Sequence, residues 1–549
     1  MASLAKPQDH KPVSMMRIVI ASSAGTAFEW YDFFIFGSLA PVIGKAFFSG
    51  LDPTPALLAA LGLFAAGFFF RPLGALIFGI VGDRLGRKGA FLVTVSLMGG
   101  ATFLIGVLPT YATAGLLAPL LLILLRLVQG IALGGEYGGA AIYVAEHAAA
   151  DRRGRDTAGI QSSASFGLLA AMLVILASRT SLGETAFNAW GWRIPFLVSV
   201  ALLAVSVWMR ARLSESPVFA KLAEAGEVAK APLREAFGSH FKMMTIVFFG
   251  IMFAQGAVWY FTFFYLQVFL EKSLGVPPAT KDMLLILMTV VSAPLYVFFG
   301  WMSDRLGRKF VMVGGMALAL VLYFPASHWI ADAANPALIE AQAATPVFVE
   351  TNPSTCSVQF DPLGTAKFVS ACDIAKSALI GKGVSFITRP SANGSTHVII
   401  GTETVPIADG EGLSGADLKA LKTDTAGAIG AELLEAGYPK SADPKQSNMI
   451  LLVIILMAFV VAATALYGPQ AAALVEMFPT RIRYTAMSFP YHVGTGWVGG
   501  FLPVTSFALV AITGNIYAGL WYAVVFTGIS VVVSLLFLKE TAGRRLEEV

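Results

Sequence analysis

Charged residues are scarce in this sequence. Only 13% of its 549 residues are Asp, Glu, Lys or Arg, whereas 56% are hydrophobic. Soluble globular proteins carry roughly 25% charged residues, so the share here is about half of the usual one. The mean hydropathy is +0.72. Because a soluble fold has too little interior to bury this much apolar side chain, the composition excludes a soluble multidomain protein and indicates a polytopic membrane protein.

Cysteine is nearly absent as well. The two present, Cys356 and Cys372, are too few for a disulfide framework, an iron–sulfur site or a cysteine-based zinc site. The net charge of +4 is small, so nucleic acid is not expected as a partner. The sequence has no nucleotide-binding loop, metal cluster or nucleophile triad. We therefore expect no enzyme activity, no metal and no cofactor.

Long apolar runs dominate the chain. A membrane-spanning helix needs roughly 20 apolar residues to cross about 30 Å of hydrocarbon. Twelve runs fit this requirement, at residues 17–48, 56–81, 89–109, 115–147, 157–179, 191–211, 242–270, 282–302, 310–331, 449–476, 484–512 and 516–538. The predicted fold class is an all-α polytopic membrane protein with twelve transmembrane helices.

Lys and Arg near the span ends predict the orientation. They cluster after the even-numbered spans, as in Arg84-Leu-Gly-Arg87-Lys88 and Arg152-Arg153-Gly-Arg155, and are few on the other side. Because basic loops stay in the cytoplasm, both termini are predicted to be cytoplasmic.

Two motifs recur along the chain. Gly82-Asp-Arg-Leu-Gly-Arg-Lys88 returns as Ser303-Asp-Arg-Leu-Gly-Arg-Lys309, an offset of 221 residues. Glu146…Arg152 is echoed by Glu476…Arg481 at an offset of 330 residues, counted between the two glutamates. The offset grows by about the length of the single long polar stretch. The chain is therefore predicted to be two parallel six-helix halves, with an insertion in the second half, as in alternating-access transporters.

These boundaries divide the chain into five segments. They are an N-terminal six-helix half (1–211), a cytoplasmic linker (212–241), helices 7–9 (242–331), an insertion module (332–446) and helices 10–12 (447–549).

The insertion is predicted to lie outside the cytoplasm as a small α/β module. Alternating runs at 384–388 and 396–400 predict strands, and 418–436 predicts a helix. We expect Cys356 and Cys372 to form a disulfide in that compartment; two buried free thiols are the alternative. The module has no catalytic constellation, and a role in gating, in partner docking or no essential role are all open.

The repeated Gly-Asp-Arg-Leu-Gly-Arg-Lys motif resembles the signature loop of the major facilitator superfamily. Three further segments resemble its metabolite:H⁺ symporter branch, namely Ala27-Phe-Glu-Trp-Tyr-Asp-Phe33, Arg126-Leu-Val-Gln-Gly130 with Gly134-Gly-Glu-Tyr-Gly-Gly139, and Gly191-Trp-Arg-Ile-Pro-Phe196. The resemblance covers both membrane halves and leaves the insertion unexplained. Members of that branch are proton-coupled importers of organic acids or of osmolytes such as proline and betaine.

This resemblance implies a monomeric secondary transporter in a bacterial inner membrane. The leading expectation is proton-coupled import of a small organic acid by alternating access. A zwitterionic osmolyte such as proline or betaine is the alternative cargo. A different class of function, a transporter-like sensor that uses the insertion, is less favoured because the sequence has no cytoplasmic output domain.

Ionisable residues inside predicted spans indicate functional positions, because each costs at least about 2.5–3.5 kcal/mol in the bilayer. Glu29 and Asp32 are three residues apart and share a helix face, so we expect them to form the proton-coupling site. Glu136 is expected to relay the proton. Arg126 is expected to face Asp32 and to bind a substrate carboxylate. A purely structural arginine–carboxylate bridge is the alternative.

Further substrate contacts are expected from helices that line the central cavity in the fold that the resemblance implies. These candidates are Tyr31, Arg71, Gln129, Tyr137, Gln255, Trp259, Tyr260, Tyr467 and Gln470. His492 is interpreted as a hydrogen-bond partner between helices rather than a proton carrier.

The loop motifs are expected to form cytoplasmic ion pairs that gate the transporter. The expected pairs are Asp83 with Arg87, Asp304 with Arg308, Glu146 with Arg152 and Glu476 with Arg481, and Arg84 belongs to the first motif. The alternative is that the basic loops merely enforce topology.

Overall fold

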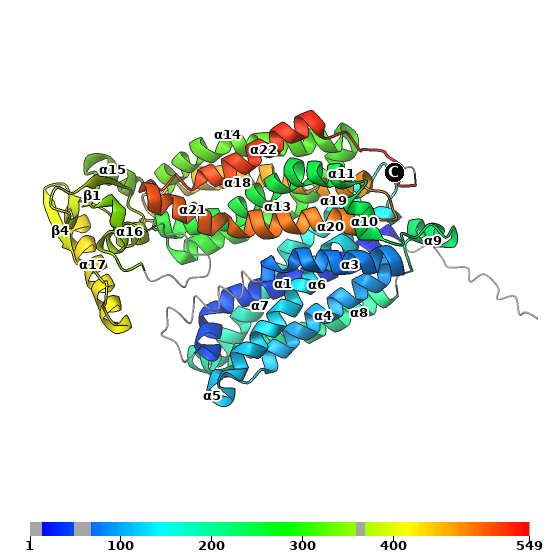
Figure 1. Cartoon of the computed structure of the whole chain (residues 1–549), viewed down its shortest axis with the longest axis horizontal. Helices are drawn as coiled ribbons and strands as arrows, with labels where there is room; N and C mark the ends of the chain where they lie inside the picture. Colours follow the sequence, from blue (N-terminus) through cyan, green and yellow to red (C-terminus); the bar gives the residue numbers. More distant parts are fainter. Residues whose placement is uncertain (1–13, 49–66, 213, 358–367, 548–549) are drawn as a thin grey trace, which may run out of the picture.

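The computed structural model describes residues 14–48, 67–212, 214–357 and 368–547. Figure 1 shows its long helices in two groups that lie side by side, with the first half of the chain below the second. The first group contains α1 (Met15–Phe47), α3 (Arg71–Leu85), α4 (Arg87–Val107), α5 (Tyr111–Ala114), α6 (Leu117–His147), α7 (Arg153–Ala186), η1 (Phe187–Gly191) and α8 (Arg193–Ala211).

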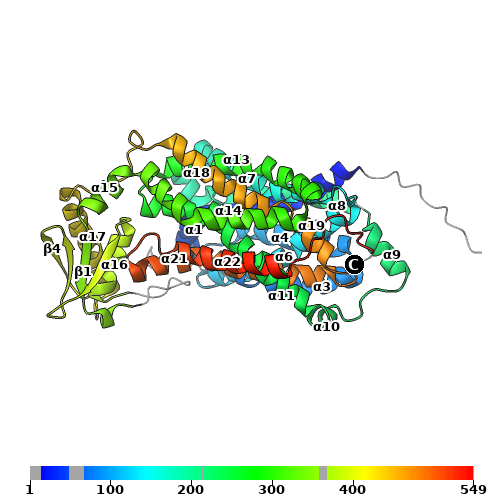
Figure 2. The same cartoon turned by 90° about the horizontal axis from the view of Figure 1, so that it is seen from above.

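The second group begins with a continuous run of helical turns, Phe241–Ser273, which we call helix 7. It continues with α13 (Pro278–Leu306), α14 (Arg308–Ala334), α18 (Met449–Tyr467), α19 (Gln470–Met477), α20 (Arg483–Val493), η7 (Gly494–Gly499), α21 (Gly500–Thr513) and α22 (Leu520–Phe537). Two short helices, α9 (Pro217–Glu224) and α10 (Pro232–Phe237), connect the groups. We call the end of the molecule with α9 and α10 the linker end and the opposite end the insertion end (Figure 2).

Two contact regions join the halves. On one side α20 packs against α3 and α6, and on the other side α13 packs against α7. We call them the α20 seam and the α13 seam.

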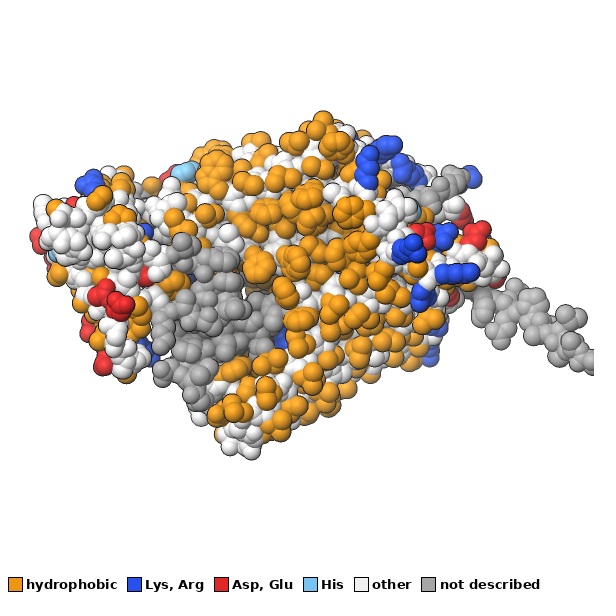
Figure 3. All heavy atoms as spheres, in the orientation of Figure 1, with side chains coloured by type: hydrophobic (Ala, Val, Ile, Leu, Met, Phe, Trp, Pro, Cys, Tyr) orange, Lys and Arg blue, Asp and Glu red, His pale blue; other side chains and the backbone are white. Residues whose placement is uncertain are grey.

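The surface between the two ends is apolar. In Figure 3 hydrophobic side chains cover the flanks of the helices, while Lys and Arg gather at the linker end. Within the described residues, ten helices are long and apolar enough to cross a membrane. The other two predicted spans correspond to α1, which contains four charged residues, and to 56–81, of which only the part from residue 67 is described. The chain is a multi-pass membrane protein with a predominantly helical membrane part.

The repeated motif forms the same turn in both halves. Gly86 separates α3 from α4 at φ +109°, and Gly307 separates α13 from α14 at φ +102°. A side chain with a Cβ is strained at such an angle, so glycine is required where each helix pair reverses direction.

Helix 7 departs from regular α-helix along most of its length. It contains π turns at η2 (Phe248–Met252), η3 (Gln255–Trp259), η4 (Phe261–Tyr265) and η5 (Phe269–Ser273), with α11 (Phe241–Val247) and α12 (Leu266–Val268) between or before them. Such turns rotate the following side chains and often occur at functional positions.

The insertion is an α/β module. It contains α15 (Pro336–Ala344), β1 (Val347–Thr351), η6 (Pro353–Thr355), α16 (Ala371–Gly381), β2 (Phe386–Pro390), β3 (Thr396–Ile400), β4 (Glu403–Ile407) and α17 (Gly415–Glu435). The sheet order is β2-β1-β3-β4, with β1 parallel to β2 and antiparallel to β3. The structure joins Cys356 to Cys372 in a disulfide.

Backbone hydrogen bonds attach the module to the second half. The N–H of Phe386 in β2 donates to the carbonyl of Gly514 after α21 at 2.8 Å, and the N–H of Ala442 donates to Gly275 after helix 7 at 2.9 Å. The side-chain amide of Asn335 adds a hydrogen bond to the carbonyl of Leu274 at 2.9 Å. The module is therefore held against the ends of helix 7 and α21.

Candidate functional site

A small central cavity lies where α1, α3, α6, helix 7, α18, α20 and η7 meet. Its lining consists of Thr26, Glu29, Trp30, Arg71, Tyr137, Gln255, Trp259, Tyr260, Tyr467, Tyr491 and Thr495. The enclosed space, about 10 Å³, is close to the room that one water molecule needs. Both halves contribute side chains, so any relative movement of the halves changes the shape of this cavity.

Two charged side chains face the cavity without an ion-pair partner among the described residues. Glu29 of α1 is 7% exposed and Arg71, the first residue of α3, is 6% exposed. The guanidinium of Arg71 lies 4.4 Å from the ring centroid of Phe68, and its Nε has no hydrogen-bond partner. Arg71 and Glu29 interact electrostatically with each other, but neither is in an ion pair within 4 Å among the described residues, so both groups are available to bind a ligand or a proton.

Asp32, by contrast, is held inside the first half. Its Oδ1 accepts hydrogen bonds from Thr102 Oγ1 at 2.8 Å and from Gln129 Nε2 at 3.0 Å. Arg126 Nη1 donates to Gln129 Oε1 at 2.9 Å and lies 3.9 Å from Asp32 Oδ2, while its guanidinium covers the Phe36 ring. The structure thus brings Arg126 to Asp32. Neither belongs to the cavity lining given above.

The aromatic side of the cavity is built across the two halves. The Tyr137 ring of α6 stacks on Tyr491 of α20 with centroids 3.8 Å apart. The hydroxyls of Tyr491 and Tyr467 lie 2.7 Å apart, and Gln161 donates to the Tyr137 hydroxyl at 2.8 Å. Aromatic rings at such positions present flat apolar surfaces together with hydroxyl groups. Sequence reasoning missed Tyr491 because aromatic residues are common in membrane helices.

The other predicted residues lie around this cavity in different ways. Glu136 forms an ion pair with Arg210 at 2.6 Å and accepts from Thr94 at 3.1 Å, all within the first half. The hydroxyl of Tyr31 donates to the Pro195 carbonyl at 2.7 Å, away from the lining. Gln470, at the start of α19, is buried but is likewise not part of the lining. Gln255, Trp259, Tyr260 and Tyr467 do line the cavity.

A second cluster closes the linker end. Glu146, near the end of α6, accepts from Arg483 Nη1 of the second half at 2.7 Å, and its Oε2 is 3.9 Å from Arg87 Nε. Glu476 of α19 accepts from Arg153 Nη1 of the first half at 2.8 Å and from Arg308 Nη2 at 3.3 Å. Each glutamate therefore binds the motif arginine of its own half and a second arginine from the opposite half.

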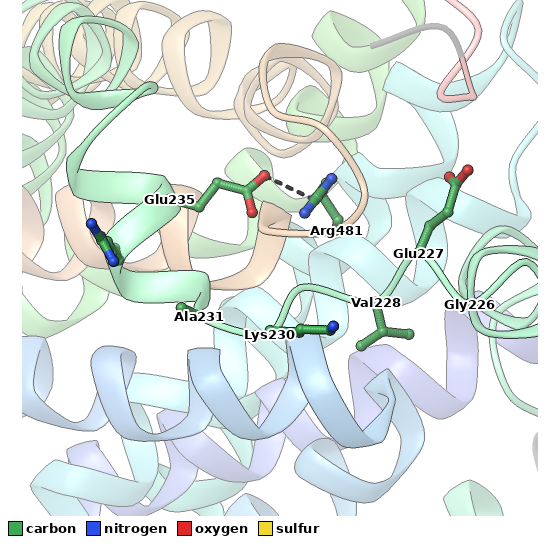
Figure 4. A pocket seen from close by; sticks show the side chains of 8 residues that line it. Gly226, Glu227, Val228, Lys230, Ala231, Glu235 and Arg481 are labelled. Atoms are coloured by element: carbon green, nitrogen blue, oxygen red, sulfur yellow. Dashed lines mark ion pairs between the residues drawn. The ribbon is translucent and has the colours of Figure 1, made fainter.

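This pattern corrects two predicted pairs. Arg152, predicted to pair with Glu146, is 62% exposed and pairs with Asp151 at 3.6 Å. Arg481, predicted to pair with Glu476, pairs instead with Glu235 of α10 at 2.8 Å, across a hollow lined by both (Figure 4). The sequence repeat agrees with the observed pairs, because the offset of 330 residues between the two glutamates also separates Arg153 from Arg483.

The motif aspartates cap helices of the opposite half. Asp83 accepts from Arg87 at 2.8 Å and from the N–H groups of Tyr484 and Thr485, which begin α20, at 3.0 and 2.9 Å. Asp304 accepts from Arg308 at 2.6 Å and from the N–H groups that begin α7. A carboxylate at a helix N-terminus satisfies free N–H groups and the helix dipole. Arg84 of the first motif donates to the carbonyl of Lys230 in the linker.

Two further acids, which the sequence analysis missed, extend this symmetry. Glu215 accepts from the N–H of Arg87 at 3.1 Å at the start of α4. Glu540 accepts from the N–H of Arg308 at 2.8 Å at the start of α14. Each acid follows the last helix of its half, and the two neighbouring sequences, Ser-Glu-Ser-Pro and Lys-Glu-Thr-Ala, differ enough to hide the repeat.

The ionisation of Glu540 depends on these contacts. Burial alone would raise the pKa of its carboxyl, but backbone N–H donors outweigh burial and hold the pKa below its ordinary value. The donors belong to Ala542, Arg308, Thr541 and Lys309.

Comparisons with known proteins agree with this architecture. A family model described as "Sugar (and other) transporter" matches residues 17–239 and 425–549. The proton:xylose symporter XylE bound to 6-bromo-6-deoxy-D-glucose is similar in fold, with a TM-score of 0.59 and 16% identity over 97% of this chain and 98% of that chain. A double tryptophan mutant of XylE gives a TM-score of 0.61 at the same identity and coverage.

Curated relatives have higher identity. The proline/betaine transporter of Salmonella typhimurium is 34% identical over 316 residues, 55% of this chain and 63% of that protein. The Escherichia coli shikimate transporter is 37% identical over 56% of this chain and 71% of that protein.

The inner membrane metabolite transport protein YhjE of Escherichia coli is 34% identical over 65% of this chain and 81% of that protein. These relatives are membrane transporters rather than enzymes. Together with the two-half helical fold and the repeated motif, they show that the chain belongs to the sugar (and other) transporter family of the major facilitator superfamily.

Proposed function

We propose that this protein is a proton-coupled secondary transporter that imports a small carboxylate-bearing metabolite across a bacterial inner membrane. Twelve spans, cytoplasmic termini and alternating access between the two halves belong to the same proposal. The single observation that carries it is the presence of Arg71 and Glu29, both without an ion-pair partner among the described residues, in one cavity between the halves.

Arg71 is the proposed anchor for the substrate carboxylate. Its guanidinium offers several N–H donors in a planar fork that suits a carboxylate, and it faces the cavity. Arg126 has the same chemistry, but it is engaged with Gln129, Asp32 and the Phe36 ring. The predicted order of importance of the two arginines is therefore reversed in this proposal.

Glu29 is the proposed carrier of the coupled proton. A substrate carboxylate beside Arg71 and an ionised Glu29 would place two negative charges near one guanidinium in a medium of low dielectric constant. Like charges in such a medium favour protonation of one of them. Substrate binding therefore favours proton uptake by Glu29, which couples the two movements. Asp32 and Glu136 support the helices through their own hydrogen bonds and ion pairs.

A zwitterionic cargo is the second candidate, and a separate observation favours it. Trp30, Trp259, Tyr260 and Tyr491 line the same cavity as Glu29. Aromatic faces and a carboxylate attract a cationic amine or quaternary ammonium group, while Arg71 takes the carboxylate. The relatives include a proline/betaine transporter and a shikimate transporter, so both cargo classes occur among similar proteins.

Uptake into proteoliposomes tests the proposal. Purified protein is reconstituted, and accumulation of labelled shikimate, di- and tricarboxylates, proline and betaine is measured with and without an inward proton gradient. We expect gradient-driven accumulation of one class, and we expect Glu29→Gln to abolish accumulation while exchange of substrate across the membrane continues.

The matched control is Glu224→Gln, which changes an exposed glutamate in the linker region and should transport like the unaltered protein. Accumulation by Glu29→Gln at the normal rate and gradient would refute the assigned proton carrier. Accumulation of proline or betaine alone would select the zwitterion over the organic acid.

A further inference from the structure

A second cavity, which the proposed function does not use, lies beside the central one in the α13 seam. We call it the side cavity. Its lining comes from α1, α7, helix 7 and α13, and its apolar members include Phe34, Leu168, Phe263 and Leu285. The free space is about 20 Å³, enough for a water molecule but too small for an organic group.

The hydroxyl side chains of the side cavity already donate to the backbone. Ser165 Oγ donates to the Thr289 carbonyl at 3.0 Å, and Ser292 Oγ donates to the same carbonyl at 2.8 Å. Thr289 Oγ1 donates to the Leu285 carbonyl at 2.7 Å. A hydroxyl group has one proton to donate, so these three hydroxyls offer no donor to a ligand. The side cavity therefore suits an apolar group better than a hydroxyl-bearing one.

Trp259 forms the boundary between the two cavities, because its side chain lines both of them. On α1, Trp30 of the central cavity and Phe34 of the side cavity are one helical turn apart, which confirms that the cavities adjoin. The Trp259 indole N–H donates to the hydroxyl of Tyr296 on α13 at 2.8 Å. Trp259 also ends the π turn η3, a kind of turn that is frequent at functional positions.

We propose that the cargo is a carboxylate that carries an apolar ring, and that this ring enters the side cavity when the Trp259 indole moves aside. Arg71 holds the carboxylate in the central cavity. Neither cavity has room for a ring, but displacement of the indole joins them and frees the space that the indole occupies. The ring of the cargo then replaces a ring that contacts Trp30 and Phe263, with centroids 5.0 and 5.2 Å away. This inference rests on the proposed function for the carboxylate anchor and names the class of its substrate.

Equilibrium binding of a matched pair of acids tests the substrate class. Cyclohexanecarboxylate and quinate have the same carboxylate and the same six-membered ring, but the ring of quinate carries hydroxyl groups. Their Kd values are measured by equilibrium dialysis with the reconstituted full-length protein, together with that of succinate, which has no ring. We expect cyclohexanecarboxylate to bind at least about ten-fold more tightly than either, because burial of an apolar ring is favourable and buried hydroxyls without donors are costly.

Tighter binding of quinate or succinate than of cyclohexanecarboxylate would overturn this inference and leave the transport of a carboxylate in place. Absence of binding by all three acids would overturn the carboxylate anchor as well. Because binding is measured without a proton gradient, a failure of proton coupling in the uptake assay does not affect the result.

Filling the side cavity supplies a second measurement. Ala164 of α7 is buried and lines the side cavity, so Ala164→Leu adds apolar atoms where the ring would lie. The matched control is Ala170→Leu, the same change on the same helix but about 120° around its axis and outside the lining. We expect Ala164→Leu to raise the Kd of cyclohexanecarboxylate at least about ten-fold with little change for succinate, and Ala170→Leu to change neither. Equal changes for both acids would overturn the placement of the ring.

Tyr296→Phe tests the movement of Trp259 and keeps the size of the side chain. The indole N–H then loses its acceptor in the unloaded position, so moving the indole aside costs less. We expect the Kd of cyclohexanecarboxylate to fall about two- to ten-fold while that of succinate stays the same. An unchanged or higher Kd of cyclohexanecarboxylate would overturn the role of Trp259 as the boundary that moves.

Discussion

Glu146 of the first half accepts a hydrogen bond from Arg483 of the second half at 2.7 Å, and both side chains are buried. Its counterpart is the pair between Glu476 and Arg153, at 2.8 Å, with the two halves exchanged. The same interaction thus occurs twice across the pseudo-symmetry of the molecule. Because each pair has one partner in each half, both must break when the halves separate at the linker end.

Removing these reciprocal pairs should destabilise the closed linker end. Glu146→Gln removes the carboxylate that pairs with Arg483, and Glu476→Gln removes the one that pairs with Arg153. Removing one partner of a buried ion pair lowers the free energy of unfolding by about 3–5 kcal/mol. We expect a lower thermal midpoint in detergent and a longer distance between spin labels placed on α3 and α20 at the linker end.

Exchange of the charges supplies the control. Glu146→Arg combined with Arg483→Glu keeps one positive and one negative group, so it should restore part of the thermal midpoint that either single change loses. Additive losses in the double variant would argue against a direct interaction between the two residues.

Residues 544–546, which follow α22, bind two arginines of the ion-pair cluster at the linker end. The carbonyl of Leu546 accepts from Arg483 Nη2 at 3.3 Å, the carbonyl of Arg544 accepts from Arg153 Nη1 at 3.0 Å, and the Leu546 side chain is buried. We expect Leu546→Asp to lower the thermal midpoint and to increase opening at the linker end, because a charged group would have to enter an apolar site.

Glu547→Gln is the comparison for this change. Within the described part of the chain, Glu547 makes an exposed ion pair with Lys221 at 3.4 Å and no other. Exposed pairs contribute about 0–1 kcal/mol, so this substitution should leave the thermal midpoint almost unchanged. An effect as large as that of Leu546→Asp would mean that surface charge, rather than burial of Leu546, keeps residues 544–546 attached at the linker end.

The two arginines near the cavity should differ in their effect on substrate affinity. Arg71→Gln removes a charge-assisted contact to the substrate carboxylate, worth about 1.5–3 kcal/mol, so Kd should rise by roughly 10- to 150-fold. Arg126→Gln removes a partner of Asp32 and should lower the thermal midpoint more than it weakens substrate affinity. Equilibrium binding and thermal unfolding distinguish the two cases, and equal losses of affinity would refute the assignment of Arg71 as the anchor.

Acid should weaken the cap that Glu540 provides for α14. Its pKa is lower in the folded protein than the ordinary value of 4.5, so its stabilising contribution is complete above that value. The contribution declines as the pH falls below 4.5 and is lost once the pH passes the lowered pKa. We expect the difference in thermal midpoint between the unaltered protein and Glu540→Gln to be largest near neutral pH and to shrink in acid.

Thermal unfolding between pH 3 and pH 7 measures this difference. Glu547→Gln again provides the control, because among the described residues its carboxylate contacts Lys221 at the surface rather than a set of backbone donors. A constant difference across the pH range would show that the ionised form of Glu540 is not what stabilises the cap.

Most of the membrane part could be predicted from the sequence. Apolar runs mark the helices, since the length of a span and the exclusion of charge from lipid are properties of a continuous segment. The motif turn is equally local, because Gly86 and Gly307 are required by backbone angles within a few residues. In the insertion, the predicted strand at 396–400 and the helix at 418–436 correspond to β3 and α17, while β1, β4 and α16 were missed.

Pairing between distant residues could not be predicted in the same way. Arg152 and Arg153 are adjacent and identical in type. Of the two, Arg153 points toward the second half and binds Glu476, whereas Arg152 is exposed and pairs with Asp151. Which neighbour points inward depends on how α7 meets the second half, and local sequence does not contain that geometry.

The sequence by itself determined that this chain spans a membrane, that it consists of two related halves, and that Glu29, Asp32, Arg71 and Arg126 lie in apolar surroundings. Composition and hydropathy are sufficient for this, because lipid excludes charge whatever the tertiary arrangement. Only the tertiary structure decided that Arg71 faces the cavity while Arg126 is held by Gln129 and Asp32. That distinction arises from the packing of helices far apart in the chain, which sets the partners of each buried charge.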